Sequence, residues 1–298
     1  MNRMSRRDFT LAAAALAAAP CLAQTATAPP LLTRAVPRTG ERLPAVGLGT
    51  ANVFDNDNDR TRQNAANVLV KLAATGGRLV DTASSYGDAE IVLGKVIASA
   101  GLRDRLFIAT KLEEPDAEEL KRSRQRLKTQ AVDLLQMHNV RRPTQSLAQF
   151  KAWKEQGVCR YIGITSTFHG DYAALEAVLR REKPDFVQIG YSLDDREAEK
   201  RILPLAAEVG AGVLTALPLG RGRLLRAVRG KPLPEWATAF AGSWAQFFLK
   251  FLLGDDRVTA VIPGTSSAEH MEDDLGAMRG RLPDHDERQR MIAFVAGL

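Results

Sequence analysis

Residues 78–87 have the sequence RLVDTASSYG, in which a short apolar run ends at Asp81 and a polar turn follows. Seven other short runs, rich in Val, Ile and Leu, occur along the chain with longer amphipathic segments between them. They span residues 45–49, 106–110, 132–137, 160–164, 186–189, 212–216 and 259–262. Short apolar runs bounded by turn residues are typical of buried parallel strands. We therefore expect eight such strands.

The segments between these runs have the pattern of helices. Residues 64–74 place apolar side chains on one face, and Gly76-Gly77 follows as a stop signal. Residues 116–128 begin with acidic side chains and end with basic ones, which complements a helix dipole. Residues 236–253 predict a longer apolar helix.

Eight strands alternating with helices over about 250 residues predict an α/β fold, the (β/α)8 TIM barrel. Residues 33–43, which are polar around Arg38-Thr39-Gly40, predict an N-terminal β-hairpin before it. The alternative is a doubly wound open sheet, whose dinucleotide-binding members carry Gly-x-Gly-x-x-Gly after the first strand. Neither Gly47-Leu48-Gly49 nor Gly220-Arg221-Gly222 completes that pattern, so the barrel is favoured.

The first 28 residues have the composition of a targeting segment. Arg6 and Arg7 precede an apolar stretch at residues 11–19, and small residues follow with the spacing of a cleavage site. Adjacent arginines at this point resemble a bacterial twin-arginine signal. We expect residues 1–28 to direct export of the folded protein to the periplasm by the twin-arginine machinery, and residues 29–298 to form one domain. The alternative, an amphipathic N-terminal helix, lacks polar periodicity here.

Charge and composition exclude several classes of protein. The 298 residues carry a formal net charge of +6, but Arg3, Arg6 and Arg7 lie in the targeting segment and the remaining excess is spread along the chain. A nucleic-acid partner is therefore not expected. No apolar run reaches the 18 or so residues of a membrane span, so stable membrane insertion is not expected either. With Cys159 as the one cysteine after the signal, an intramolecular disulfide is impossible.

Four polar residues stand at or just after the ends of consecutive predicted strands. Asp81 ends the second strand and Tyr86 follows it, Lys111 ends the third, and His138 ends the fourth. Catalytic groups of such barrels lie at the C-terminal strand ends. Singly, each residue has an ordinary explanation as a helix cap, a packed ring, a surface ion pair or a core histidine. Their shared position favours a catalytic set.

The chemistry of this set is definite. A free tyrosine is a poor acid at neutral pH, with a pKa of about 10, and a nearby ammonium stabilises its phenolate. Lys111 can supply that charge, and Asp81 can orient Lys111. His138 can bind a substrate oxygen. Together they make Tyr86 a general acid directed at a carbonyl oxygen.

With these motifs the chain resembles the aldo-keto reductase family over nearly everything after the signal. The segments Ala45–Thr50, Val80–Ala83 with Tyr86-Gly87, Ala109–Lys111 and Gln136–His138 are similar to the family's first four strands. The resemblance implies that Asp81, Tyr86, Lys111 and His138 are its catalytic tetrad. It implies an NAD(P)H-dependent oxidoreductase that reduces an aldehyde or ketone to an alcohol.

The resemblance also implies a cofactor site, for NADP(H) or alternatively NAD(H). Thr165 and Ser166, where the family usually has Ser-Asn, and Gln188 would hold the nicotinamide carboxamide, and Tyr191 would stack on the ring. The loop Leu217–Gly222 would cover the pyrophosphate, and residues 262–274 would hold the adenosine phosphate. The full expected set is Gly49, Thr50, Asp81, Thr165, Ser166, Gln188, Tyr191, Pro218, Leu219, Gly220, Arg221, Gly222, Ile262, Pro263, Gly264, Thr265, Ser266, His270, Asp273 and Asp274.

The adenosine segment departs from the family pattern. Ser266 and His270 stand where many members have cations for the 2′-phosphate of NADP, and Asp273-Asp274 replaces the usual Glu-Asn. Two carboxylates repel a phosphate. Arg221 or Arg223 could still reach the phosphates. We therefore expect a weakened preference for NADPH over NADH.

Other functions remain as alternatives. We expect the protein to be a monomer. A nicotinamide-nucleotide-binding regulatory or sensor protein with little turnover fits the same fold. A barrel hydrolase or metal enzyme is disfavoured because the chain has no His-x-x-x-His or Cys-x-x-Cys pair, and no metal is expected. The family resemblance implies a small carbonyl substrate, and the candidate pocket residues are Val53, Phe54, Phe168 and Trp236.

Overall fold

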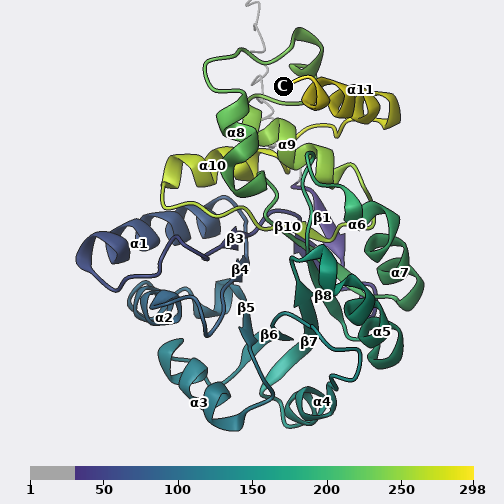
Figure 1. Ribbon diagram of the computed structural model, residues 1–298. Helices are drawn as coiled ribbons and strands as arrows, with labels where there is room; N and C mark the ends of the chain where they lie inside the picture. Colours follow the sequence, from purple (N-terminus) through teal and green to yellow (C-terminus); the bar gives the residue numbers. More distant parts are fainter. Residues whose placement is uncertain (1–30) are drawn as a thin grey trace, which may run out of the picture.

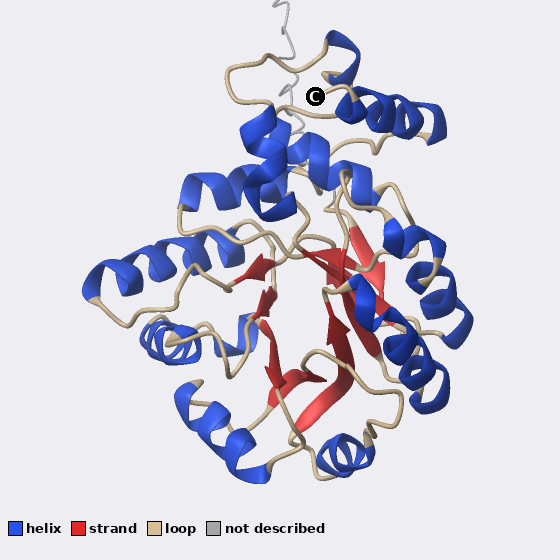
Figure 2. Cartoon of the chain, in the orientation of Figure 1, coloured by secondary structure: helices blue, strands red, loops and turns tan. Residues whose placement is uncertain are grey.

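The computed structural model describes residues 31–298, and its centre is a parallel sheet of eight strands surrounded by helices (Figures 1 and 2). The strands follow one another in chain order around the sheet, each paired in parallel with the next. They are β3 (Leu48–Gly49), β4 (Leu79–Asp81), β5 (Phe107–Leu112), β6 (Val132–Met137), β7 (Cys159–Ser166), β8 (Phe186–Gly190), β9 (Gly212–Ala216) and β10 (Ala260–Val261). All eight overlap the predicted runs. The predicted signal, residues 1–28, lies outside the described residues.

The first and last strands close the sheet into a barrel. Gly47 N donates to Val261 O at 2.8 Å, and Gly49 N donates to Pro263 O at 2.8 Å. A Cβ on Gly49 would lie 2.9 Å from the Ile262 carbonyl oxygen, so only glycine allows this close approach. The predicted (β/α)8 barrel is confirmed.

The N-terminal hairpin closes the bottom of the barrel. It pairs β1 (Thr33–Ala35) with β2 (Arg42–Pro44), as predicted. Val36 and Leu43 are fully buried in the same apolar cluster as the side chains inside the barrel. Thr39 Oγ1 lies 3.0 Å from the Tyr161 hydroxyl, which ties the hairpin turn to β7.

Helices cover the outside of the barrel (Figure 2). They are α1 (Asp59–Ala74), α2 (Ala89–Ser99), α3 (Ala117–Arg126), α4 (Ala148–Glu155), α5 (Tyr172–Glu182), α6 (Glu197–Lys200), α7 (Ile202–Val209), α8 (Arg223–Ala227), α9 (Trp244–Leu253), α10 (Ala268–Gly276) and α11 (His285–Ala296). Among residues 31–298, no helix combines the length and the apolar character that crossing a membrane requires.

One expected helix is shorter than predicted. The apolar pattern of residues 236–253 predicts a continuous helix, but α9 begins only at Trp244. Ser243 has an extended backbone, with φ of −149°, and its hydroxyl accepts a hydrogen bond from Gln246 N at 3.1 Å. This is an N-cap, and it starts a new helix there. Residues 235–237 form only a short 3-10 turn.

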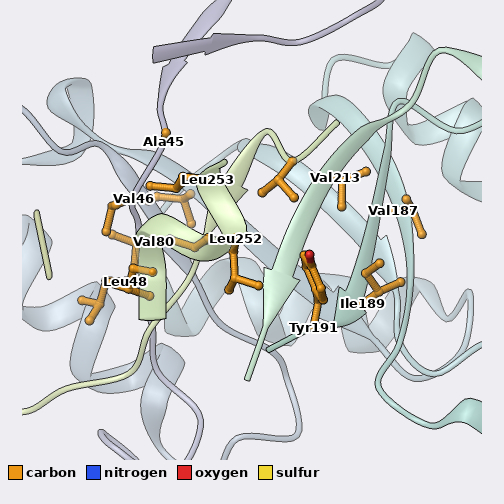
Figure 3. Close-up of a cluster of buried hydrophobic side chains, with 14 of the residues drawn as sticks. Ala45, Val46, Leu48, Val80, Val187, Ile189, Tyr191, Val213, Leu252 and Leu253 are labelled. Atoms are coloured by element: carbon orange, nitrogen blue, oxygen red, sulfur yellow. The ribbon is translucent and has the colours of Figure 1, made fainter. Parts of the chain in front are cut away.

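Strand alternation separates two apolar layers. Side chains that face the barrel interior, such as Leu79, Phe107 and Leu134, form one cluster. Their neighbours in sequence, such as Val80, belong to the larger cluster between barrel and helices, part of which Figure 3 shows. Because successive strand residues point to opposite faces, this register decides which polar side chains reach the interior.

Candidate active site

A cavity of about 540 Å³ opens at the C-terminal ends of the strands. Its lining comes from both ends and the middle of the chain, so it forms only when the barrel is complete. The lining residues include all four members of the predicted tetrad, which are Asp81, Tyr86, Lys111 and His138.

Asp81, Lys111 and Tyr86 are in direct contact. Asp81 shares the interior face with Leu79, and Lys111 shares it with Phe107, as strand alternation requires. Lys111 Nζ donates to Asp81 Oδ2 at 2.7 Å, to the Thr82 carbonyl oxygen at 2.8 Å and to the Tyr86 hydroxyl at 3.4 Å. The three donors of the ammonium are therefore all used.

The Lys111 ammonium is buried yet keeps its charge. Its side chain and that of Asp81 are 1% and 3% exposed. Burial by itself lowers the pKa of Lys111, but the adjacent Asp81 and Tyr86 reverse this, and the net pKa lies above the ordinary value. Tyr86 therefore meets a fixed positive charge, with Lys111 Nζ also 4.8 Å from its ring centroid.

Two glutamines extend this network across the barrel. Gln188 Nε2 donates to Asp81 Oδ2 at 3.2 Å, and Gln136 Nε2 donates to Gln188 Oε1 at 2.9 Å. Both amides are buried. Gln136 was not predicted as a site residue, although its position two residues before His138 places it on the interior face.

His138 is held by a residue that the sequence analysis missed. Its Nδ1 lies 2.6 Å from Glu113 Oε1, and its ring packs edge-on against Tyr86 with the centroids 5.7 Å apart. Burial and the Lys111 charge lower the pKa of His138, while Glu113 acts in the opposite direction. Glu113 follows Lys111 by two residues, and this alternate position was the signal available in the sequence.

Most of the expected cofactor residues lie on the cavity. Twelve of them line it, namely Gly49, Thr50, Asp81, Thr165, Gln188, Pro218, Leu219, Arg221, Gly222, Ile262, Pro263 and Gly264. In the loop after β9, Leu217 and Arg221 adopt left-handed backbone conformations, with φ of 57° and 53°. Arg223 is turned away, because its guanidinium pairs with Asp194 at 2.9 Å. Of the two arginines considered for the phosphates, Arg221 lines the cavity.

Ser166 and Tyr191 do not line the cavity, contrary to expectation. The Ser166 hydroxyl donates to Asp171 Oδ2 at 2.9 Å. Tyr191 is 1% exposed and belongs to the outer apolar cluster (Figure 3). Its hydroxyl contacts Glu199 and Arg288. The physical reason is strand alternation, because Thr165 and Gln188 face the barrel interior. Ser166 comes one residue after Thr165 and Tyr191 three residues after Gln188, so both face outward. Tyr191 is therefore not placed to stack on a nicotinamide ring.

Six further expected residues lie off the cavity: Gly220, Thr265, Ser266, His270, Asp273 and Asp274. Asp273 accepts a hydrogen bond from Gln246 at 2.7 Å. Burial, with a contribution from Asp273, raises the pKa of Asp274 to about 8. Burial therefore favours the neutral form of Asp274, which weakens the expected repulsion between a phosphate and this pair of carboxylates.

The candidate substrate residues divide into two pairs. Val53 and Phe168 line the cavity, and Phe168 is 53% exposed at its rim. Phe54 is fully buried in the core, and Trp236 packs against Phe247 with the ring centroids 5.8 Å apart. Six lining residues were not predicted: Ala51, Asn52, Asn139, Thr167, Ala216 and Leu225.

Over residues 31–298, no three His, Cys, Asp or Glu side chains gather in an arrangement that could hold a metal ion. The groups gathered at the cavity are a phenol, an ammonium, a carboxylate and an imidazole. They can move a proton to or from an oxygen atom and stabilise the charge that develops there.

Comparison with known proteins identifies the sequence family. The model of the aldo/keto reductase family matches residues 45–290. An aldo-keto reductase of Mycobacterium avium is 29% identical over 258 residues, which cover 83% of this chain and 85% of that protein. An uncharacterised oxidoreductase of Bacillus subtilis is 32% identical over 220 residues, covering 63% of this chain and 66% of that protein.

Solved structures agree in fold. A thermostable aldo-keto reductase in complex with the inhibitor epalrestat superposes with a TM-score of 0.73 at 26% identity, covering 88% of this chain and 99% of that one. An aldo-keto reductase of Klebsiella pneumoniae in complex with NADPH also has a TM-score of 0.73, at 22% identity, covering 89% and 95%.

Proposed function

Because this chain belongs to the aldo/keto reductase family, we propose that it reduces an aldehyde or ketone to the alcohol with NADPH as the hydride donor. The observation that carries the proposal is the contact of Lys111 with both Asp81 and Tyr86 at the floor of the cavity. If the Lys111–Asp81 ion pair only stabilised the fold, it would not need the Tyr86 hydroxyl beside it. Proton transfer to a carbonyl oxygen at the mouth of a barrel does need such a proton donor.

Each residue of the site has a separate role in the proposed reaction. When bound, NADPH supplies a hydride to the carbonyl carbon. Tyr86 donates its hydroxyl proton to the carbonyl oxygen, and the Lys111 ammonium stabilises the phenolate that remains. Asp81 holds Lys111 in place, and His138 is the group that would bind the substrate oxygen beside Tyr86.

The cavity suits a dinucleotide in its shape and polarity. Gly49 and Gly264 bring two backbones together, and a Cβ on Gly264 would lie 3.2 Å from Gly49 O. Thr165 and Gln188 offer polar groups on the interior wall, and Arg221 offers a cation at the mouth. We infer that the first two bind the nicotinamide end and that Arg221 binds the phosphates.

Titration of the purified protein with NADPH and with NADH tests both function and preference. We expect both to quench tryptophan fluorescence, with dissociation constants within about tenfold of each other, since Ser266 and His270 supply no permanent cation for a 2′-phosphate. A hundredfold preference for NADPH would contradict the weakened preference. Failure of both to bind would contradict the reductase function, and tight binding without turnover of any carbonyl would favour the regulatory alternative.

We further propose that residues 1–28 export the protein to the periplasm through the twin-arginine machinery. The adjacent Arg6 and Arg7 before an apolar stretch support this. In fractionated bacterial cells, we expect the full chain in the periplasm and an Arg6→Lys/Arg7→Lys variant in the cytoplasm. Cytoplasmic location of the unaltered chain would contradict the proposal.

A further inference from the structure

Glu113 forms a compact hydrogen-bonded group with His138 and Ser85. The carboxylate oxygen Oε1 lies 2.6 Å from His138 Nδ1 and accepts a hydrogen bond from the Ser85 hydroxyl at 2.8 Å. Ser85 Oγ is itself 3.3 Å from Nδ1. The Glu113 amide donates to Glu119 Oε1 at 3.2 Å, which fixes the backbone that carries the carboxylate.

The other nitrogen of the ring remains available to a substrate. His138 lines the cavity and its side chain is 12% exposed. Within the described part of the chain, every hydrogen bond of its ring is made by Nδ1. Nε2 is therefore the atom that can meet a substrate oxygen.

We propose that Glu113 is a positioning residue that keeps a proton on His138 Nδ1, so that Nε2 accepts a hydrogen bond when the ring is neutral and donates one only when the ring is protonated. The inference rests on the proposed function and adds a residue to it. A carboxylate accepts but does not donate, so the neutral ring must place its single proton on the nitrogen that faces Glu113.

This arrangement distinguishes the carbonyl substrate from the alcohol product. A carbonyl oxygen has only lone pairs, so it binds the protonated ring, whereas an alcohol hydroxyl can donate to the neutral ring. The ionisable groups that face His138 are Lys111, Glu113, Asp81 and Tyr86. Burial and Lys111 lower the pKa of His138, and Glu113 opposes them. Carbonyl binding should therefore tighten as the pH falls, while alcohol binding should not.

Two substitutions separate the charge of Glu113 from its role as an acceptor. In Glu113→Gln the amide oxygen still accepts from Nδ1, but the negative charge is lost. In the unaltered protein we expect the KM for the carbonyl to rise about tenfold between pH 5 and pH 8. In Glu113→Gln the same rise should occur at a pH lower by about one unit, because the protonated ring has lost the negative charge beside it. In Glu113→Ala the proton is free to move to Nε2, and KM should become nearly independent of pH. The matched control is Glu114→Gln, because Glu114 is exposed and pairs only loosely with Arg142, at 3.9 Å.

A spectroscopic measurement tests the proton position without turnover. Nitrogen chemical shifts of ¹⁵N-histidine in the NADPH-loaded protein, assigned with His138→Asn, report which ring nitrogen carries the proton. We expect the neutral ring of His138 to be protonated at Nδ1 in the unaltered protein and at both nitrogens in exchange in Glu113→Ala. A neutral ring protonated at Nε2 in the unaltered protein, or identical pH profiles in all variants, would overturn the proposal. Absence of turnover with the expected shifts would overturn the reductase function and leave the position of the proton intact.

Discussion

Tyr86→Phe is expected to lower kcat/KM for carbonyl reduction by about 10²–10⁴-fold while leaving NADPH affinity unchanged within about twofold. The substitution removes the hydroxyl that lies 3.4 Å from Lys111 Nζ and keeps the ring that packs against His138. The loss should therefore fall on the chemical step. Steady-state kinetics with an aldehyde, together with fluorescence titration by NADPH, measure the two quantities.

A second tyrosine provides the control for this substitution. Tyr161 lies inside the same barrel, but its hydroxyl contacts Glu41 and Thr39 at the closed end. Tyr161→Phe should leave kcat/KM within about threefold of the unaltered protein, since the two hydrogen bonds that it removes are remote from the cavity. If Tyr86→Phe retained most of the activity, Tyr86 could not be the general acid.

Lys111→Met is expected to abolish measurable reduction and to lower the free energy of unfolding by about 3–5 kcal/mol. It leaves the Asp81 carboxylate buried without its ammonium, and it removes the cation beside Tyr86. The double variant Lys111→Met/Asp81→Asn removes the stranded charge as well. It should recover about half or more of the lost stability, but none of the activity.

Urea unfolding followed by tryptophan fluorescence measures the stability of these variants. Lys250→Met is the matched control, because Lys250 is also buried but donates to the carbonyl oxygens of Arg279 and Arg281, away from the cavity. It should lower stability without lowering kcat. Equal instability of the single and double variants at Lys111 would show that Asp81 was not the stranded group.

The sequence predicted the barrel, and the meeting of Asp81, Tyr86, Lys111 and His138 at one cavity, because both depend on short-range patterns. Strand runs ending in Asp81, Lys111 and His138 determine which edge of the sheet these side chains occupy. The alternation along β7 also indicates that Ser166 faces outward, and the alternation of β8, continued one residue past its end at Gly190, indicates the same for Tyr191. The resemblance assigned them to the cofactor site without applying that alternation, and the structure places them on the other face.

Other features depend on contacts between distant segments and could not be predicted locally. The position of Glu113 two residues after Lys111 places it near the strand ends, but its pairing with His138 joins two different strands, and the sequence does not specify that partner. The start of α9 depends on the backbone of Ser243, which interrupts a run that is apolar on both sides. The raised pKa of Asp274 follows from its burial, which depends on how distant segments pack in the fold.

The seam that closes the barrel has a consequence for the synthesis of the protein. Gly47 and Val261 form its hydrogen bond from opposite ends of the described chain, so closure has a very high contact order. A chain still attached to the ribosome holds β3 and β9 as two unpaired edges until residues near 261 emerge. Pairing of either edge with another chain is the expected route to aggregation during that interval. The emergence of β10 thus decides whether the nascent protein becomes a closed barrel or stays an open sheet.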